Sequence, residues 1–347
     1  MQHRKKHVPI IIGLLALLLV ILLLIGIGIG AVWIPPGEVL SLIKSGLNAS
    51  SSGYSGQMLS HYIIIWSIRF PRVLLGAMVG ICLSVAGAIF QGLFRNPMAD
   101  PYVIGVSSGA ALGAVAAILL LGNLGIRYSY SIPAFAFVCA ILTILLVYNL
   151  ARTGGKVPVM TLLLAGIAVN SFLSALQSLA MFYSGDQLHQ VVFWLMGGFS
   201  SRGWEYIGMF MPYAVIGTAI AFLYTRELNG MLIGEEQAQH LGIDVERVKI
   251  ILLVAAALLI GASVSVSGLI GFVGLIIPHV VRLIIGPDHR VLLPMVALTG
   301  AIFMVGADII ARTVIAPEEL PVGVVTALIG GPFFIYLLRK QKTTLYK

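Results

Sequence analysis

The chain has 347 residues, of which 59% are hydrophobic and only 10% are charged. Soluble domains contain roughly 25% charged and about 45–50% apolar residues, so this composition excludes a soluble enzyme and indicates an integral membrane protein. A membrane-spanning helix needs about 20 apolar residues, which leaves room for roughly ten spans and no sizeable soluble domain. The net charge of +8 does not predict nucleic-acid binding, because the basic residues are dispersed among the loops.

The first apolar run, at about 8–33, follows the basic segment at 3–7 and is longer than the roughly 7–15 residues of a signal-peptide core. We therefore predict a retained first span whose basic end lies in the cytoplasm. Pro35 and Pro36 end this span, and a Ser/Gly-rich outer loop follows through 50–53 to about 61. Further spans are predicted at about 62–92, 103–122, 132–150, 159–183 and 205–225.

Small residues mark two of these spans as closely packed helices. Residues spaced by three or four positions allow another helix to approach closely. In the second span they are Gly76, Gly80, Ser84, Gly87 and Gln91, and in the third they are Gly105, Gly109 and Gly113.

The apolar run at about 248–285 is too long for one span, and Gly268, Gly271 and Gly274 divide it into two. A ninth span is predicted at about 293–312, and a tenth runs from the outer loop at 316–321 to the basic tail at 339–342. Ten spans place both termini on one side. About 15 of the 21 Lys and Arg residues then fall beside inner segments, which predicts an all-α polytopic membrane protein with cytoplasmic N and C termini.

One polar stretch, from Arg226 to Lys249, interrupts the apolar pattern between the sixth and seventh spans. It contains Glu235, Glu236 and His240, which cannot lie in lipid. A membrane protein that exposes such a segment presents it to another molecule.

The sequence lacks the motifs expected of an ATP-binding or zinc-dependent enzyme. Gly154-Gly155-Lys156 lacks the first glycine and the hydroxyl residue of a phosphate-binding loop, so we expect no ATP bound by this chain. The metalloprotease motif H-E-x-x-H does not occur. Cys82 and Cys139 lie in apolar runs without ligand spacing, which indicates packing and predicts no metal site.

Several polar residues within spans have two interpretations. Asp308 and Arg312 have i, i+4 spacing, which suits a self-neutralising pair but also a proton relay. His279 follows Pro278 and is interpreted as structural rather than as a ligand. Asn170, Ser174 and Gln177 share one face of the fifth span and either line a path or bind a neighbouring helix.

Long motifs appear in a fixed order from about residue 60 onward. They are Arg69-Phe70-Pro71-Arg72, the Arg95–Pro101 turn, Gly271 to Arg282, Ala307 to Arg312 and Leu320 to Gly323. Together they resemble the iron-chelate and cobalamin permease family, the membrane subunits of type II ABC importers. The first sixty residues contain none of these motifs and resemble that family only in their general pattern of an apolar span followed by a loop.

The resemblance implies one transmembrane permease domain over residues 1–347, with the first span and outer loop at 1–60, core helices at 61–339 and a cytoplasmic coupling segment at 226–249. It implies a multi-pass protein of the cytoplasmic membrane, working with a second permease subunit of the same or a similar kind. Two cytoplasmic ATPases and an extracytoplasmic substrate-binding protein complete the expected assembly. The permease is expected to perform no catalysis and to bind no cofactor directly, because the ATPase subunits use the ATP.

The expected function is alternating-access import of a metal chelate, with a ferric siderophore as the expected cargo. Cobalamin or haem is the alternative within the same family. An ion-coupled secondary transporter is the alternative from another class, but it would need buried carboxylates around a cation site, and Asp308 alone is available.

The resemblance also assigns residues. Arg69, Arg72 and Arg312 are expected to dock the binding protein from an exposed rim, and Asn170, Ser174 and Gln177 to line the path. Local chemistry in the coupling segment fits a short helix: Ala238 and Leu241 are expected to share a face, Gly242 to end the helix and Asp244 to cap the next one. The residues expected to contact the ATPase are Gly234, Glu235, Glu236, Gln237, Ala238, His240, Leu241 and Gly242.

Overall fold

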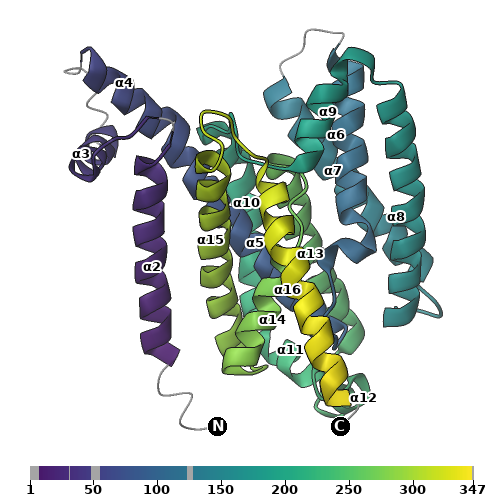
Figure 1. The fold of residues 1–347 in the computed structure, drawn as a ribbon. Coiled ribbons are helices and arrows are strands. Elements are labelled where there is room, and N and C mark those ends of the chain that lie inside the picture. The colour runs from purple at the N-terminus through teal and green to yellow at the C-terminus, as the bar shows by residue number, and fades with distance from the viewer. Residues whose placement is uncertain (1–7, 31, 48–54, 123–127, 346–347) are drawn as a thin grey trace.

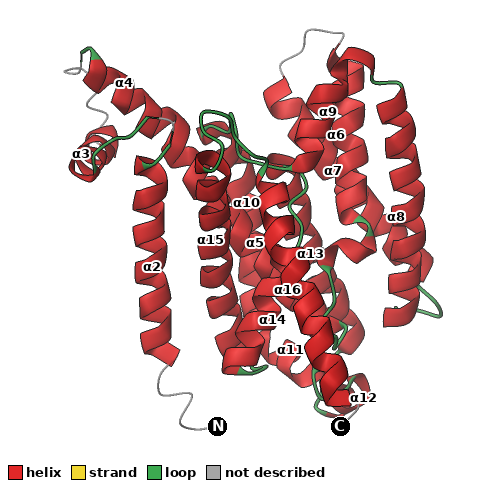
Figure 2. Ribbon diagram, in the orientation of Figure 1, coloured by secondary structure: helices red, strands yellow, loops and turns green. Residues whose placement is uncertain are grey.

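The computed structural model describes residues 8–30, 32–47, 55–122 and 128–345, and this part of the chain consists of helices joined by loops, without a β-strand (Figure 2). The basic segment at 3–7 and the Ser/Gly-rich stretch at 50–53 lie outside the described residues. The helices of the first half are α2 (Val8–Gly28), α3 (Pro36–Leu47), α4 (Gln57–Ile63), α5 (Phe70–Leu93), α6 (Val106–Gly122), α7 (Tyr128–Ala151) and α8 (Val159–Phe182). Those of the second half are α9 (Leu188–Met196), α10 (Trp204–Leu223), α11 (Thr225–Met231), α12 (Glu235–His240), α13 (Val245–Ser267), α14 (Val273–Ile285), α15 (His289–Thr313) and α16 (Val322–Leu345).

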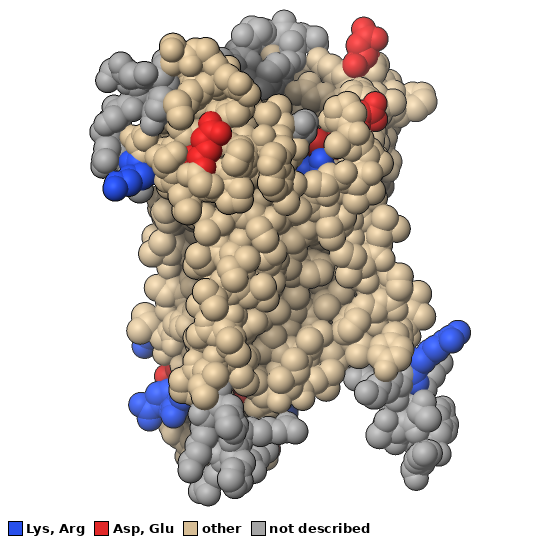
Figure 3. Space-filling view, turned by 60° about the vertical axis from the view of Figure 1, so that its left-hand side comes forward, with Lys and Arg blue, Asp and Glu red and all other residues tan. Residues whose placement is uncertain are grey.

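The number of spans agrees with the prediction. Within the described ranges, seven helices are long and apolar enough to cross a membrane, and three shorter apolar helices lie at Val106–Leu121, Val273–Ile285 and Val322–Leu337. The start of α2 and the end of α16 lie at the same end of the bundle (Figure 1), as an even number of spans requires. Charged side chains gather at the two ends of the molecule, with a broad uncharged band between them (Figure 3).

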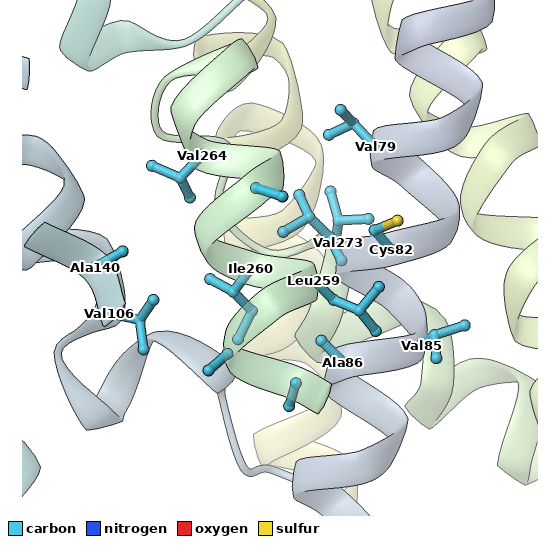
Figure 4. Packing of buried hydrophobic residues seen from close by; sticks show 14 of the residues in the cluster. Val79, Cys82, Val85, Ala86, Val106, Ala140, Leu259, Ile260, Val264 and Val273 are labelled. Carbon is cyan, nitrogen blue, oxygen red and sulfur yellow. The ribbon is translucent and has the colours of Figure 1, made fainter. Parts of the chain in front are cut away.

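The bundle is built around α5 and α13, which are mostly buried, whereas α2 and α8 on opposite flanks are mostly exposed (Figure 1). In the core, Cys82 and Ala86 of α5 lie close to Leu259 of α13 (Figure 4). Cys82 is 1% exposed, which confirms its packing role.

The small-residue patterns mark real helix contacts. A Cβ atom on Gly80 would collide with the Gly300 carbonyl oxygen of α15, and one on Gly87 would collide with that of Gly274 in α14. Gly109 and Gly113 of α6 are pressed in the same way against α7. Glycine lets these backbones approach closely, as predicted for both spans.

The division of the 248–285 run is confirmed, with one correction. The seventh span ends at Ser267, followed by Gly268 with a φ of 70°, and α14 begins at Val273. Gly274 lies inside α14 rather than in the break, because its role is the close approach to α5.

The outer loop after the first span is more structured than predicted. Helix α3 buries Val39 and Leu42 in a small cluster with Ile65, so its apolar residues recur at helical spacing. Between α4 and α5, residues Ile64–Arg69 form a π-helical turn, η1. Such turns are frequent at functional sites, and this one leads directly into Arg69 and Arg72.

The contact between Gly87 and α14 can be tested by adding one methyl group. We expect Gly87→Ala to destabilise the chain by about 1–3 kcal/mol, because overpacking forces two backbones apart, and to lower the melting temperature in detergent. Gly208→Ala in α10 is the matched control, since a Cβ there meets nothing within 4 Å. Equal melting temperatures for the two variants would contradict the predicted close packing.

Candidate functional site

The polar interruption lies at the end of the bundle where α2 begins and α16 ends (Figure 1). It forms two short helices, α11 and α12, between α10 and α13. Gly234, with a φ of 138°, precedes α12, and Gly242, with a φ of 81°, follows it. The Asp244 carboxylate accepts from the Arg247 backbone N–H at 3.2 Å, which confirms its predicted capping role.

The exposed side of this segment is apolar in two places. Ile233 is 65% exposed and Leu241 is 66% exposed, whereas Ala238 is fully buried. The prediction that Ala238 and Leu241 share a face is wrong: Ala238 is buried against the bundle, whereas Leu241, the residue that caps the end of α12, is exposed. Two large apolar side chains are thus exposed on a polar segment, and the role of this surface in contacting an ATPase stays a prediction.

One polar contact attaches α12 to α13. The Lys249 Nζ lies 2.6 Å from Glu235 Oε2 and 3.2 Å from Glu246 Oε1. Lys249 is 5% exposed, so this ammonium group is held by two carboxylates inside the structure. Glu235 therefore has an internal role in orienting α12.

A second polar contact attaches α11 to α15. The Asn229 amide donates from Nδ2 to Asp288 Oδ1 at 2.8 Å and accepts at Oδ1 from the His289 backbone N–H at 2.8 Å. Because Asp288 also caps the first turn of α15, the coupling segment is joined to the start of that helix.

A network of charged side chains lies at the opposite, outer end. Arg72 donates through Nε and Nη2 to Asp308 Oδ1 at 3.0 and 2.9 Å and through Nη1 to both Glu319 oxygens at 2.9 and 2.8 Å. The predicted Asp308 and Arg312 pair forms, with Nε and Oδ2 3.1 Å apart. The Ser200 hydroxyl donates to Glu319 at 2.6 Å, so the network joins α5, α15, the segment before α10 and the α15–α16 loop.

Arg69 and Arg312 also bind the end of the first span. Arg69 donates to the carbonyls of Gly28 at 2.7 Å and Val32 at 2.6 Å. Arg312 donates to the carbonyls of Gly26 at 3.0 Å and Ile29 at 3.2 Å. The last carbonyls of a helix lack intrahelical partners, and cations are favoured there, so these arginines terminate α2.

The three arginines lie together, but not on an exposed rim as expected. Arg69, Arg72 and Arg312 are 6%, 5% and 5% exposed. The reason is that helix-end carbonyls and carboxylates of the same chain surround their guanidinium groups. Their role in docking a partner stays a prediction.

Asn170, Ser174 and Gln177 lie on α8, where Leu162, Gly166 and Val169 form the narrow buried stripe. Asn170 and Gln177 are half-buried beside that stripe, and Ser174 is exposed. Phe172 and Leu179, on the far side of the helix, are 64% and 53% exposed. The described chain therefore leaves most of α8 uncovered, and the path role of the three polar residues stays a prediction.

Sequence reasoning missed several residues of both sites. Glu319 was assigned only to an outer loop, and Lys249 and Asn229 only to a polar stretch. The sequence contained two usable signals. A lysine near the start of an apolar span, such as Lys249, needs a charged partner. The glycines at 26, 28 and 30 mark a helix end that Arg69 and Arg312 approach closely.

A helical bundle with an apolar band, a polar surface-exposed segment at one end and a charged network at the other indicates a multi-pass membrane protein. Comparison with known proteins gives the family. Residues 18–340 match the model of the FecCD transport family, and the chain belongs to this family of ABC importer permeases in the cytoplasmic membrane.

Its relatives include permeases for different cargoes. The chain is 49% identical to the cobalamin import system permease protein BtuC of Halobacterium salinarum, covering 81% of this chain and 74% of the relative. It is 44% identical to the hemin transport system permease protein HmuU of Yersinia pestis, covering 80% and 84%. It is 41% identical to the Fe(3+)-citrate import system permease protein YfmD of Bacillus subtilis, covering 81% and 82%.

A solved structure, described as an inward-facing conformation of a candidate metal-chelate type ABC transporter, is also similar. It matches with a TM-score of 0.82 and 32% sequence identity over 96% of this chain and 99% of that chain. The sequence-based family resemblance is thereby confirmed.

The outer network gives a pH prediction. Burial alone would raise the pKa of the Glu319 carboxyl, but the Ser200 hydroxyl and Arg72 hold it below its usual value of 4.5. A lowered carboxyl pKa stabilises the fold above the unfolded pKa, and that stabilisation is lost as pH falls through the native pKa. We expect Glu319→Gln to lower the melting temperature at neutral pH, with a difference that shrinks below pH 4.5.

The neighbouring Glu318 is exposed and provides the control. Glu318→Gln should match the unsubstituted chain at every pH in the same thermal melts. A Glu319→Gln difference that persists unchanged into acid would contradict the ion pair as its source.

Proposed function

We propose that this chain is the membrane-spanning subunit of an ATP-driven importer that moves a ferric siderophore inward by alternating access. The observation that carries the proposal is the segment from α11 to Asp244, which exposes Ile233 and Leu241 at the end of the bundle. A chain with no phosphate-binding loop and such a surface is suited to receive movement from a separate ATPase.

The proposed ATPase contact comprises Gly234, Glu235, Glu236, Gln237, Ala238, His240, Leu241 and Gly242. Within it, Glu236, His240 and Leu241 are exposed and would touch the ATPase. Glu235 and Ala238 would support the helix from behind, because one binds Lys249 and the other is buried. This end of the bundle, with both chain termini, would then be cytoplasmic.

The remaining partners follow from the uncovered and charged surfaces. A second permease subunit, identical or similar, would pair with this one so that Asn170, Ser174 and Gln177 of α8 face a central path, since polar groups in lipid are costly. A substrate-binding protein would dock at the outer end, near Arg69, Arg72 and Arg312. One domain over residues 1–347 would thus contact all partners, without a bound cofactor of its own.

The cargo is proposed within the range that the relatives define. A ferric siderophore is the first candidate, because Arg202 lines a cavity at the outer end and carries a positive charge suited to an anionic chelate. Cobalamin is the second candidate, supported by the 49% identity to a cobalamin import permease. Haem is the third, supported in the same way by the hemin permease.

Transport in proteoliposomes tests the proposal. The chain is reconstituted with its ATPase and binding protein, and uptake of an iron-labelled carboxylate-type siderophore is measured with ATP inside and no ion gradient. We expect ATP-dependent uptake, and Leu241→Asp should lower it about tenfold or more, because an unpaired charge in an apolar contact costs at least about 1.4 kcal/mol. Arg152→Asp, a charge change in another inner loop, should leave uptake unchanged.

Uptake that follows an imposed sodium or proton gradient without ATP would instead support a secondary transporter. Uptake of labelled cobalamin or haem without siderophore uptake would show that the proposed cargo is wrong. The proposed ATP-driven mechanism would stand. Full ATP-driven uptake by Leu241→Asp would overturn the assignment of the coupling surface.

The path assignment is tested by thiol labelling of the assembled complex. In a chain whose Cys82 and Cys139 are replaced by alanine, Ser174→Cys should react with a membrane-impermeant thiol reagent, because a path holds water. Leu179→Cys, on the opposite side of α8, should stay unreactive in lipid. Equal labelling of the two positions would contradict the path.

A further inference from the structure

An outer cavity of about 470 Å³ lies beneath α9 and the segment that leads into α10. Its walls include Phe193, Trp194, Arg202 and Tyr206, and Arg72 and Glu319 lie at one side. Concave sites of about 300–1,000 Å³ with aromatic walls and a few placed polar groups are typical of small-molecule binding sites. None of the coupling or path residues lines this cavity.

The cavity wall already holds one carboxylate. Glu319 receives hydrogen bonds from Arg72 and Ser200. The Glu319 side chain is 36% exposed while that of Arg72 is 7% exposed, so the carboxylate sits on the open side of the pair. It shows that this wall can bind a carboxylate group.

Arg202 supplies a positive charge that the described residues do not balance. Arg72, Arg312, Asp308 and Glu319 neutralise one another, whereas Arg202 forms no ion pair in the described part of the chain. Its guanidinium carbon lies 4.5 Å from the centre of the Tyr206 ring, and Nη1 donates to the Tyr206 hydroxyl at 2.7 Å. These two contacts fix the direction of the guanidinium group.

Two N–H donors of the lining residues have no partner. The Trp194 Nε1 and Arg202 Nε atoms are buried without a hydrogen-bond partner among the described residues, and Trp194 is 8% exposed. An unsatisfied buried donor is costly, and both residues line the cavity, so an acceptor ligand that reached these two N–H groups would be stabilised. Between these residues Ser201 has a φ of 59°, and strained backbone of this kind clusters at binding sites.

We propose that this cavity binds a small molecule bearing carboxylate groups, with Arg202 and Trp194 as donors and Glu319 as an internal competitor for the same charge. The inference rests on the proposed import function, in which such a molecule is the cargo or its chelating part. It favours a carboxylate-bearing chelate over one whose periphery carries neutral amides. Arginine recognises carboxylates through paired N–H donors, and the aromatic walls pack against the ligand body.

Binding of citrate to the full chain in lipid nanodiscs, measured by isothermal titration calorimetry, tests the proposal. We expect saturable binding of citrate and none of its neutral triamide. Arg202→Gln should weaken binding about tenfold or more, because the charge-assisted hydrogen bond to the carboxylate is lost. Arg202→Lys should restore part of the affinity, and Trp194→Phe, which keeps an aromatic ring, should weaken binding several-fold.

Glu319→Gln distinguishes a binding site from a merely structural cluster. Removing the competing negative charge should tighten citrate binding about threefold, since like charges repel across the cavity, whereas structural damage would only weaken it. Arg247→Gln at the inner end is the unaffected control. Melting temperatures identify any variant that fails to fold. If the Arg202 variants do not fold, the proposal is still tested by Glu319→Gln, which should raise the citrate affinity, and by Trp194→Phe, which should lower it.

No saturable binding of citrate, equal binding of citrate and triamide, or unchanged affinity in Arg202→Gln would overturn the proposal. A cavity used only by a protein partner would give the first of these results. The titration needs no ATPase, so loss of ATP-driven uptake with intact citrate binding would reject the proposed function alone, and the reverse result would reject this inference alone.

Discussion

Three buried guanidinium groups hold the outer ends of α2, α5 and α15 together. Arg69 and Arg312 bind the last carbonyls of α2, and Arg72 and Arg312 share the Asp308 carboxylate. Buried charges are tolerated only when they are paired and hydrogen-bonded, and removing one partner of such a pair costs about 3–5 kcal/mol. Because α2 buries little of its own surface in the chain, these polar contacts add to its limited packing against α15 and α5.

Helix α15 connects this outer network of charges to the coupling segment at the inner end. α15 starts at His289, whose backbone binds Asn229 of α11, and it carries Asp308 and Arg312 near its other end. Its 25 residues span about 37 Å at 1.5 Å per residue. Gly300 brings α15 into backbone contact with α5 midway, so a displacement at the inner end would be carried along a stiff, closely packed helix pair to the outer charges.

Much of this architecture was predictable because lipid imposes simple rules. Apolar length predicts spans, and small residues such as Gly87 and Gly109 predict close contacts. The burial of Arg72 was not predictable, since its carboxylate partners Asp308 and Glu319 are more than 230 positions away in sequence. The orientation of Leu241 was missed for a local reason, because one residue at a helix end decides which way a side chain points.

The two flanking helices show why exposure alone does not define a lipid-facing surface. Both α2 and α8 leave most of their surface uncovered by the rest of the chain. The described part of α2 has no polar side chain, which suits lipid on the sides that the chain leaves uncovered, whereas α8 carries Asn170, Ser171, Ser174 and Gln177. Ser171 satisfies its hydroxyl within the helix by donating to the Ile167 carbonyl at 3.0 Å. An amide side chain such as that of Gln177 has two donors and an acceptor to satisfy, so the cost of placing it in hydrocarbon argues that a second subunit or water covers this side of α8.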